Sequence, residues 1–189
     1  MEFNYPPQAD AYRAKVKEFL KANLPAGWKG IGALSNDEAF EFTNKWRKTL
    51  FENGFLAVQW PKEYGGQGLS SLEMVVLTEE FFKAGVPTGG HNDGFGIAML
   101  GNTLLAVGTE EQKKYYLPRI LAGEDLWCQG YSEPAAGSDL GNLGCRAILD
   151  GDEWVINGQK IWTTGGHHAD HIFVLARTSP DDVKHKGIT

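Results

Sequence analysis

The stretch Gln129-Gly130-Tyr131-Ser132-Glu133-Pro134-Ala135-Ala136-Gly137-Ser138-Asp139 decides the fold and points to a binding site. It follows an apolar, strand-like run and then places hydroxyls, a proline, small residues and an acid in quick succession. A second such stretch, Asn157-Gly158-Gln159-Lys160-Ile161-Trp162-Thr163-Thr164, comes shortly afterwards. Their hydroxyls can donate to a ligand, or they can satisfy the nearby backbone, as Ser and Thr side chains commonly do.

The composition indicates a folded protein of one domain or two small ones. The chain has 189 residues, of which 42% are hydrophobic and 22% charged, so we expect a buried core. The net charge of −6 argues against nucleic-acid binding, which usually needs a basic face. Cys128 and Cys145 show no disulfide-framework spacing, which favours a reduced, cytoplasmic protein. We expect neither a signal peptide nor a membrane span, because no apolar run is long enough.

Residues 8–123 carry the pattern of helices. Tyr12, Val16, Phe19 and Leu20 recur on one face of a helix. Three capping boxes are predicted where a hydroxyl precedes an acid or amide by three positions: Ser35 with Glu38, Ser70 with Glu73, and Thr109 with Gln112.

Residues 94–107 are apolar on nearly all sides. A helix of this kind is expected to be buried within its domain. Its residues are interpreted either as plain core or as the wall of an apolar ligand pocket.

From Asp125 the sequence period changes from that of helices to that of strands. We expect strands at 127–132, 145–149, 154–156, 159–164 and 172–176, with tight hairpin turns at Asp150-Gly151 and Asn157-Gly158. The predicted fold class is therefore α+β: an all-α domain over residues 1–123, followed by an antiparallel β domain over residues 124–189.

The two quoted stretches resemble the flavin-contacting strands of the acyl-CoA dehydrogenase family. The resemblance covers nearly the whole chain from about residue 8. It includes the loop Trp60-Pro61-Lys62-Glu63-Tyr64-Gly65-Gly66-Gln67-Gly68 and the segment Gly108-Thr109-Glu110-Glu111-Gln112-Lys113. The resemblance implies a helical domain, a middle β domain of which this chain carries the first part, and a C-terminal four-helix domain that this chain lacks.

The resemblance also implies FAD as the cofactor and assigns residues to it. Ser132 matches a hydroxyl on the reactive face of the flavin ring, Trp162 an indole that packs on the ring, and Thr164 a hydroxyl near flavin N5 and O4. Ser138 matches a serine where the flavin diphosphate and the acyl-CoA approach each other. The full set of expected cofactor contacts is Gln129, Tyr131, Ser132, Ser138, Trp162, Thr163 and Thr164.

The implied reaction is the α,β-dehydrogenation of an acyl-CoA thioester to the trans-2-enoyl-CoA. The expected substrate contacts are Ser138, Phe95, Gly96 and Met99. The reaction needs a carboxylate base at the substrate Cα. In the family this base comes from the C-terminal domain, so we expect no catalytic residue in this chain. Glu133 matches a position in the flavin strand and is not the family's base.

The resemblance further implies an electron-transfer flavoprotein as electron acceptor and assembly as a homo- or hetero-oligomer, a dimer or a tetramer. Two alternatives stay open: a non-catalytic binding part of a heteromer whose other chain supplies the base, and an acyl-CoA oxidase or monooxygenase on the same scaffold. His167, His168 and His171 are interpreted as a polar loop rather than a metal site.

Overall fold

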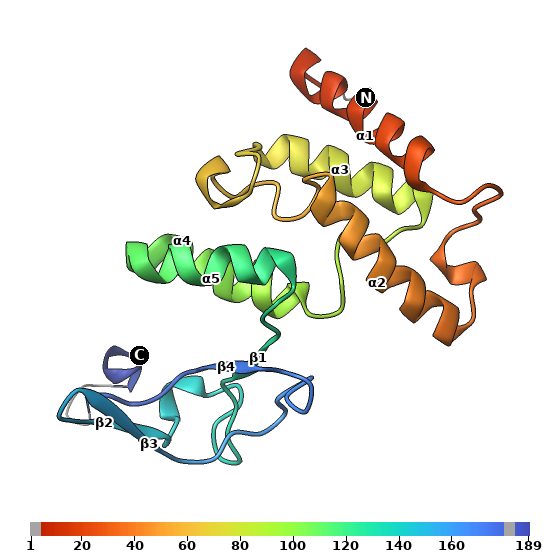
Figure 1. Ribbon diagram of the computed structural model, residues 1–189. Helices are drawn as coiled ribbons and strands as arrows, with labels where there is room; N and C mark the ends of the chain where they lie inside the picture. Colours follow the sequence, from red (N-terminus) through yellow and green to blue (C-terminus); the bar gives the residue numbers. More distant parts are fainter. Residues whose placement is uncertain (1–4, 180–183) are drawn as a thin grey trace. The chain divides into compact units, whose positions relative to one another are not determined.

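A computed structural model describes residues 5–179 and 184–189 of the chain (Figure 1). The chain divides into two compact units, with the division between Glu124 and Asp125. Within the described residues, no helix is both long and apolar enough to cross a membrane.

The first unit is helical throughout. Its elements are α1 (Pro7–Asn23), η1 (Ile31–Ala33), α2 (Asn36–Glu52), η2 (Lys62–Tyr64), α3 (Ser71–Ala84), η3 (Gly94–Gly101), α4 (Asn102–Val107) and α5 (Glu110–Ala122). All three predicted capping boxes are confirmed: they open α2, α3 and α5, each with both reciprocal hydrogen bonds. Because these bonds satisfy otherwise unpaired amides, they fix where each helix begins.

Aromatic side chains form the core of the helical unit. Phe19 of α1 stacks on Phe55 with ring centroids 4.1 Å apart, and its ring lies 5.4 Å from that of Trp46 on α2. Phe81 of α3 is fully buried and contacts the same group. The helical face predicted from Tyr12, Val16, Phe19 and Leu20 is therefore the one that α1 buries.

A charged cluster joins α1 to α3 beside this core. Arg13 Nη1 lies 2.5 Å from Glu80 Oε1 and 2.8 Å from Glu79 Oε2. The Glu80 side chain is only 5% exposed. Burial raises the pKa of Glu80, but hydrogen bonds from Lys83 and Arg13 outweigh burial, so its pKa lies below the ordinary value.

The prediction that residues 94–107 are buried is wrong for this unit. The segment forms a π-helix, η3, that continues into α4 and packs on α5, which lies beside α4 in Figure 1. Gly101 lies so close to the Trp60 ring that a Cβ there would collide with it. Met99 is nevertheless 43% exposed and Val107 80% exposed. An all-round apolar helix is buried only where enough chain surrounds it, and the described residues cover it on part of its circumference.

The second unit contains two short pairs of strands. Its elements are β1 (Trp127–Gly130), η4 (Leu140–Asn142), β2 (Arg146–Asp150), β3 (Glu153–Asn157), β4 (His171–Val174) and η5 (Lys184–Gly187). β2 and β3 form the antiparallel hairpin predicted at Asp150-Gly151, whereas β1 and β4 pair in parallel. The prediction of a helical domain followed by a β domain is confirmed, but antiparallel pairing does not hold for β1 and β4.

Two further local predictions are wrong in this unit. Residues 159–164 form no strand, because Trp162 has a φ of 58°, in the left-handed region, and this breaks an extended chain. Asn157-Gly158 makes no hairpin turn but leads from β3 into this irregular segment. Gly158 is required for another reason: a Cβ there would lie 2.6 Å from the Cα of Cys145.

Candidate functional site

The two stretches of sequence singled out above meet in the β unit. The backbone N–H of Ile161 donates to the carbonyl oxygen of Ser132 at 2.9 Å. Lys160 Nζ donates to the carbonyl oxygen of Tyr131 at 3.1 Å. The chain just after β1 and the segment just before Trp162 therefore run side by side, as a shared ligand site requires.

Trp162 is the most unusual residue of this site. Its side chain is 84% exposed, although indoles are usually well buried. Its left-handed backbone conformation costs on the order of 1–3 kcal/mol in a residue other than glycine. An exposed indole held at a strained position is what a flat, largely apolar ring would need as a packing partner. On this observation the site fits the flavin that the resemblance implies.

The remaining predicted cofactor residues differ in how accessible they are. Ser132 and Thr163 are half-buried, while Ser138 and Thr164 are exposed. The Thr164 amide donates to the carbonyl oxygen of Trp162 at 2.9 Å, which tightens the turn after the indole. Ser132, Thr163 and Thr164 therefore lie on the two segments that run side by side. Ser138 lies in the loop that follows Glu133.

Gln129 and Tyr131 are partly committed to contacts within the unit. Gln129 lies on β1 opposite Phe173 of β4, and the Tyr131 ring meets the Phe173 ring edge-on with centroids 5.8 Å apart. Both residues are half-buried. Their positions are thus fixed by the parallel strand pair, which carries the chain into Ser132.

Glu133 is occupied by hydrogen bonds and an ion pair. Its carboxylate accepts from the amides of Gly144 at 2.6 Å and Cys145 at 2.9 Å, and from Lys160 Nζ at 2.8 Å. Burial raises the pKa of Glu133, but Lys160 and the two amides together hold its pKa below the ordinary value. An ionised, fully engaged carboxylate is a poor general base, as expected from its place in the motif.

Sequence reasoning missed the role of Lys160. It lies inside the second stretch and pairs with the single acid that precedes Pro134 in the first. The sequence offered one signal for this pairing. Lys160 and Glu133 carry opposite charges, and each is flanked by uncharged neighbours in its own stretch. Only the fold shows that the two meet.

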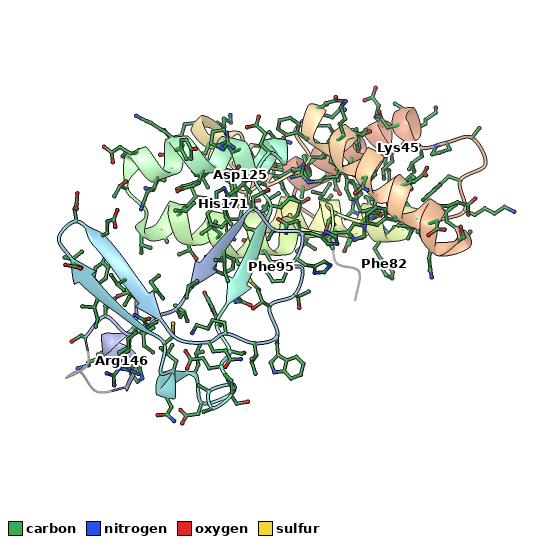
Figure 2. All side chains as sticks on the ribbon, turned by 60° about the horizontal axis from the view of Figure 1, so that its bottom comes forward. Lys45, Phe82, Phe95, Asp125, Arg146 and His171 are labelled. Atoms are coloured by element: carbon green, nitrogen blue, oxygen red, sulfur yellow. The ribbon has the colours of Figure 1, made fainter. Side chains whose placement is uncertain are left out.

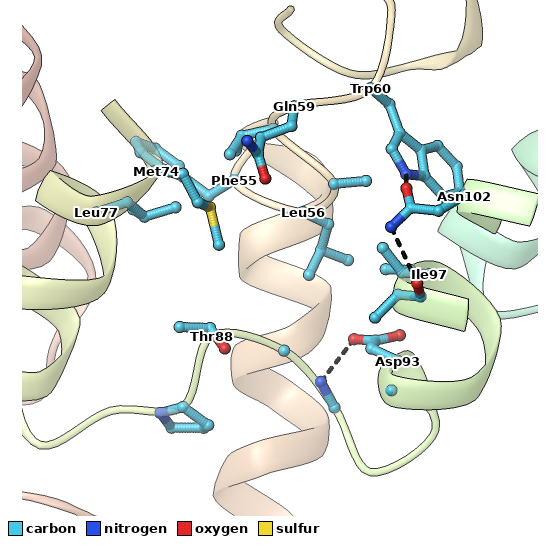
Figure 3. Close-up of a pocket in the computed structure, with 17 residues that line it drawn as sticks. Phe55, Leu56, Gln59, Trp60, Met74, Leu77, Thr88, Asp93, Ile97 and Asn102 are labelled. Carbon is cyan, nitrogen blue, oxygen red and sulfur yellow. Dashed lines mark hydrogen bonds between the residues drawn. The ribbon is translucent and has the colours of Figure 1, made fainter. Parts of the chain in front are cut away.

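A cavity of about 440 Å³ lies within the helical unit (Figure 3). Met74 and Leu77 of α3 line one side, and Trp60 and Ile97 line the other. Most of the wall is apolar, so the cavity suits an apolar group.

A small polar cluster lies at one edge of this cavity. The Asp93 carboxylate accepts from the Gly90 amide at 2.6 Å and pairs with Arg47 Nη2 at 2.8 Å. Because the carboxylate is already paired, it fixes the loop before η3 rather than offering a free charge to a ligand.

The predicted substrate residues do not line this cavity. Gly94, Ile97 and Ala98 face it instead, on the same helix η3. Gly96 is buried, and a Cβ there would lie 3.1 Å from the Ile120 side chain of α5. Met99 is exposed and Phe95 is half-buried. The cavity wall thus includes residues of η3, but not those predicted to contact the substrate, which stay a prediction.

His167 and His168 lie in the turn before β4, and His171 is the first residue of β4. The rings of His167 and His168 have centroids 3.9 Å apart. His171 Nε2 lies 3.7 Å from the Asp125 carboxylate near the starts of β1 and β4 (Figure 2). Within the described residues, no group of three His, Cys, Asp or Glu side chains is placed to hold a metal ion.

Comparison with known proteins identifies the family. Residues 6–124 match the model of the acyl-CoA dehydrogenase N-terminal domain, and residues 128–189 match that of the acyl-CoA dehydrogenase middle domain. The chain is 44% identical over 184 residues to the acyl-CoA dehydrogenase IpdE1 of Mycobacterium tuberculosis. The chain thus belongs to the acyl-CoA dehydrogenase family, as the resemblance predicted.

The chain is also similar to solved structures over its whole length. A structure titled "Tcur3481-Tcur3483 steroid ACAD" is 42% identical to this chain, covers all of it and has a TM-score of 0.72. The ChsE4-ChsE5 complex of Mycobacterium tuberculosis is 38% identical, covers all of the chain and has a TM-score of 0.73.

The chain spans about half the length of the relatives it matches. The alignment with IpdE1 covers 95% of this chain but 47% of IpdE1. The two structures are covered to 48% and 47% of their chains.

Proposed function

We propose that the complete protein catalyses the FAD-dependent α,β-dehydrogenation of an acyl-CoA thioester to the trans-2-enoyl-CoA. The observation that carries this proposal is the exposed indole of Trp162 at a strained backbone position, next to the bond from the Ile161 amide to Ser132. Both belong to the two stretches that resemble the family's flavin strands. FAD, when bound, supplies the hydride acceptor for the substrate Cβ.

The residues of this chain bind and orient the cofactor. The Trp162 indole packs on the flavin ring, and the hydroxyls of Ser132 and Thr164 donate toward atoms that gain negative character on reduction. Gln129, Tyr131, Ser138 and Thr163 complete the contacts along the same two segments. Donors at these positions favour the reduced cofactor and so assist the oxidation of the substrate.

The base that removes the Cα proton comes from outside the residues described here. Glu133 is held by Lys160 and two amides, and a base must be free to accept the proton. In this proposal, another part of the complete protein or a partner chain supplies the carboxylate.

We propose an acyl group with a large apolar body as the substrate. The cavity beside η3 is lined mainly by apolar side chains, and a similar structure is titled a steroid ACAD. We expect Ser138 to lie where the CoA part of the substrate passes, as the family resemblance implies. Phe95, Gly96 and Met99 stay predicted contacts on other faces of the same helix.

The proposed assembly is an oligomer, and a heteromer is favoured. Two similar structures carry two protein names in their titles, and one of these titles describes a complex. An electron-transfer flavoprotein is the proposed electron acceptor, as the family resemblance implies.

The proposal is tested on the full-length protein, alone and with any co-purifying partner, after reconstitution with FAD. Under anaerobic conditions, a ring-containing acyl-CoA should bleach the flavin absorbance and yield the enoyl-CoA by mass spectrometry. Failure of both, in protein shown to hold FAD and partner, would contradict the proposed reaction. Bleaching only after the partner is added would favour the binding-part alternative. Steady hydrogen peroxide formation in air would favour the oxidase.

A further inference from the structure

Glu133 and Lys160 form an ion pair that the proposed chemistry does not use. Their charged atoms lie 2.8 Å apart, and the side chains are 9% and 10% exposed. Removing one partner of a buried pair leaves an uncompensated charge, whereas exposed pairs contribute little. The pair is therefore a strong constraint on the segments that carry it.

The pair connects three separate parts of the β unit. Glu133 also accepts from the amides of Gly144 and Cys145, just before β2. Lys160 also donates to the carbonyl oxygen of Tyr131, just after β1. One carboxylate and one ammonium thus fix the segment around residue 160 to the end of β1 and to the start of β2.

The constrained segment leads directly into the strained indole. Lys160 is followed by Ile161, whose amide donates to Ser132 at 2.9 Å, and then by Trp162 with its φ of 58°. A residue persists in a costly backbone conformation only when its surroundings over-determine it. The contacts of Lys160 and Ile161 supply this constraint on one side of Trp162, and the bond from the Thr164 amide supplies it on the other.

We propose that Glu133 and Lys160 are positioning residues of the flavin site, whose ion pair holds Trp162 in its left-handed conformation before the cofactor arrives. This inference rests on the proposed function, because it assumes that the Trp162 indole binds the flavin. Preorganising a contact lowers the ordering cost of binding, so the pair strengthens cofactor affinity without touching the cofactor.

The test compares three substitutions in the full-length protein. Lys160→Met removes the charge, Lys160→Arg keeps it, and Lys113→Met is the matched control. Lys113 also pairs with a carboxylate, that of Glu110 at 3.1 Å, but it lies on α5 in the helical unit. Three quantities are measured: the Kd of the apoprotein for FAD, the hydrogen exchange of the Ile161 amide, and the melting temperature.

A positioning role predicts a specific pattern in these measurements. Lys160→Met should weaken FAD binding by about tenfold, equivalent to about 1.4 kcal/mol, and should speed the exchange of the Ile161 amide. Lys160→Arg should keep the FAD affinity within about threefold of that of the wild type, because the guanidinium retains the positive charge and can donate hydrogen bonds. Lys113→Met should leave both FAD affinity and Ile161 exchange unchanged.

Other outcomes overturn the proposal. Unaltered FAD affinity in Lys160→Met, with faster Ile161 exchange, would show that the pair does not serve the cofactor. Equal losses of affinity in Lys160→Met, Lys160→Arg and Lys113→Met would show general destabilisation. If Lys160→Met does not fold, hydrogen exchange in the wild-type apoprotein tests the proposal instead. Fast exchange of the Ile161 amide there would show that the segment is not held before FAD binds and would contradict the proposal.

The same measurements separate this inference from the proposed function. A wild-type protein that binds no FAD would contradict the proposed function. The exchange of the Ile161 amide would still show whether the ion pair holds the segment. Fast exchange in a wild-type protein that does bind FAD would contradict the positioning role alone.

Discussion

The backbone N–H of Ile161 donates to the carbonyl oxygen of Ser132 at 2.9 Å, and this bond brings together two stretches that are separate in the sequence. It forms outside any strand pair, next to a tryptophan at a positive φ. The contact therefore lies outside the regular sheet and fixes the segment that leads into the indole.

Replacing Trp162 by Ala should weaken FAD retention and leave the folded apoprotein intact. The exposed indole contributes little to the core, but a stacked aromatic contact is worth about 0.5–1.5 kcal/mol, which corresponds to up to about a tenfold change in Kd. Titration of the apoprotein with FAD, together with a melting curve, measures both effects.

Trp162→Phe serves as the control because it keeps an aromatic face at the same position. It should retain most of the FAD affinity. If Trp162→Ala binds FAD as tightly as the wild type, the indole does not contact the flavin.

Replacing Glu133 by Gln should leave exchange of the substrate Cα proton largely intact in a folded, flavin-loaded protein. The carboxylate already accepts from Lys160 and from the amides of Gly144 and Cys145, so it is not available as the base. Exchange of the Cα proton with deuterated solvent, followed by mass spectrometry, tests this directly. Complete loss of exchange would make Glu133 the base.

Local signals in the sequence were sufficient for the helices. The capping boxes at Ser35, Ser70 and Thr109 are each formed within three residues, so no distant contact was needed to predict them. The family resemblance, which rests on motifs that the sequence shows directly, is also confirmed.

Interactions between distant residues escaped prediction. A strand was predicted at residues 159–164, but contacts at Ser132 and Tyr131 hold the segment in another conformation. The sequence pattern of η3 predicted burial, but within the described residues Met99 is 43% exposed. Nothing local in the sequence links Glu133 to Lys160, whose pairing depends on the whole β unit.

Replacing Arg13 by Met should destabilise the protein by about 3 kcal/mol, because it leaves the buried Glu80 carboxylate without its closest partner. The Arg13–Glu80 distance is 2.5 Å, and both side chains are largely buried. Urea unfolding measures the change in the free energy of unfolding. Lys45→Met is the matched control, since Lys45 and Glu41 are 81% and 73% exposed, and it should have no measurable effect.

The same cluster predicts a loss of stability in acid. The pKa of Glu80 lies below its ordinary value of 4.5 in the folded protein, so the folded state binds fewer protons than the unfolded state as the pH falls. The contribution of Glu80 is fully present above pH 4.5 and is lost as the pH falls through its folded pKa. Urea midpoints between neutral pH and pH 3 should therefore fall less steeply in Arg13→Met than in the wild type. Equal slopes would show that Arg13 does not stabilise the ionised form.

Replacing Ile97 by Trp should fill part of the 440 Å³ cavity and discriminate against bulky acyl groups. A larger side chain on this wall takes the space that an apolar ring would use, so KM for a ring-containing acyl-CoA should rise by about tenfold or more. KM for a short-chain acyl-CoA should change little. Steady-state kinetics with both substrates on the full-length protein measures the difference.

Met99→Trp is the informative comparison, because Met99 lies on the exposed side of the same helix and does not line the cavity. It should leave the preference between the two substrates unchanged. If Met99→Trp raises the KM of the bulky substrate and Ile97→Trp does not, the acyl group lies on the face predicted from the sequence. The cavity beside Ile97 would then have no part in substrate binding.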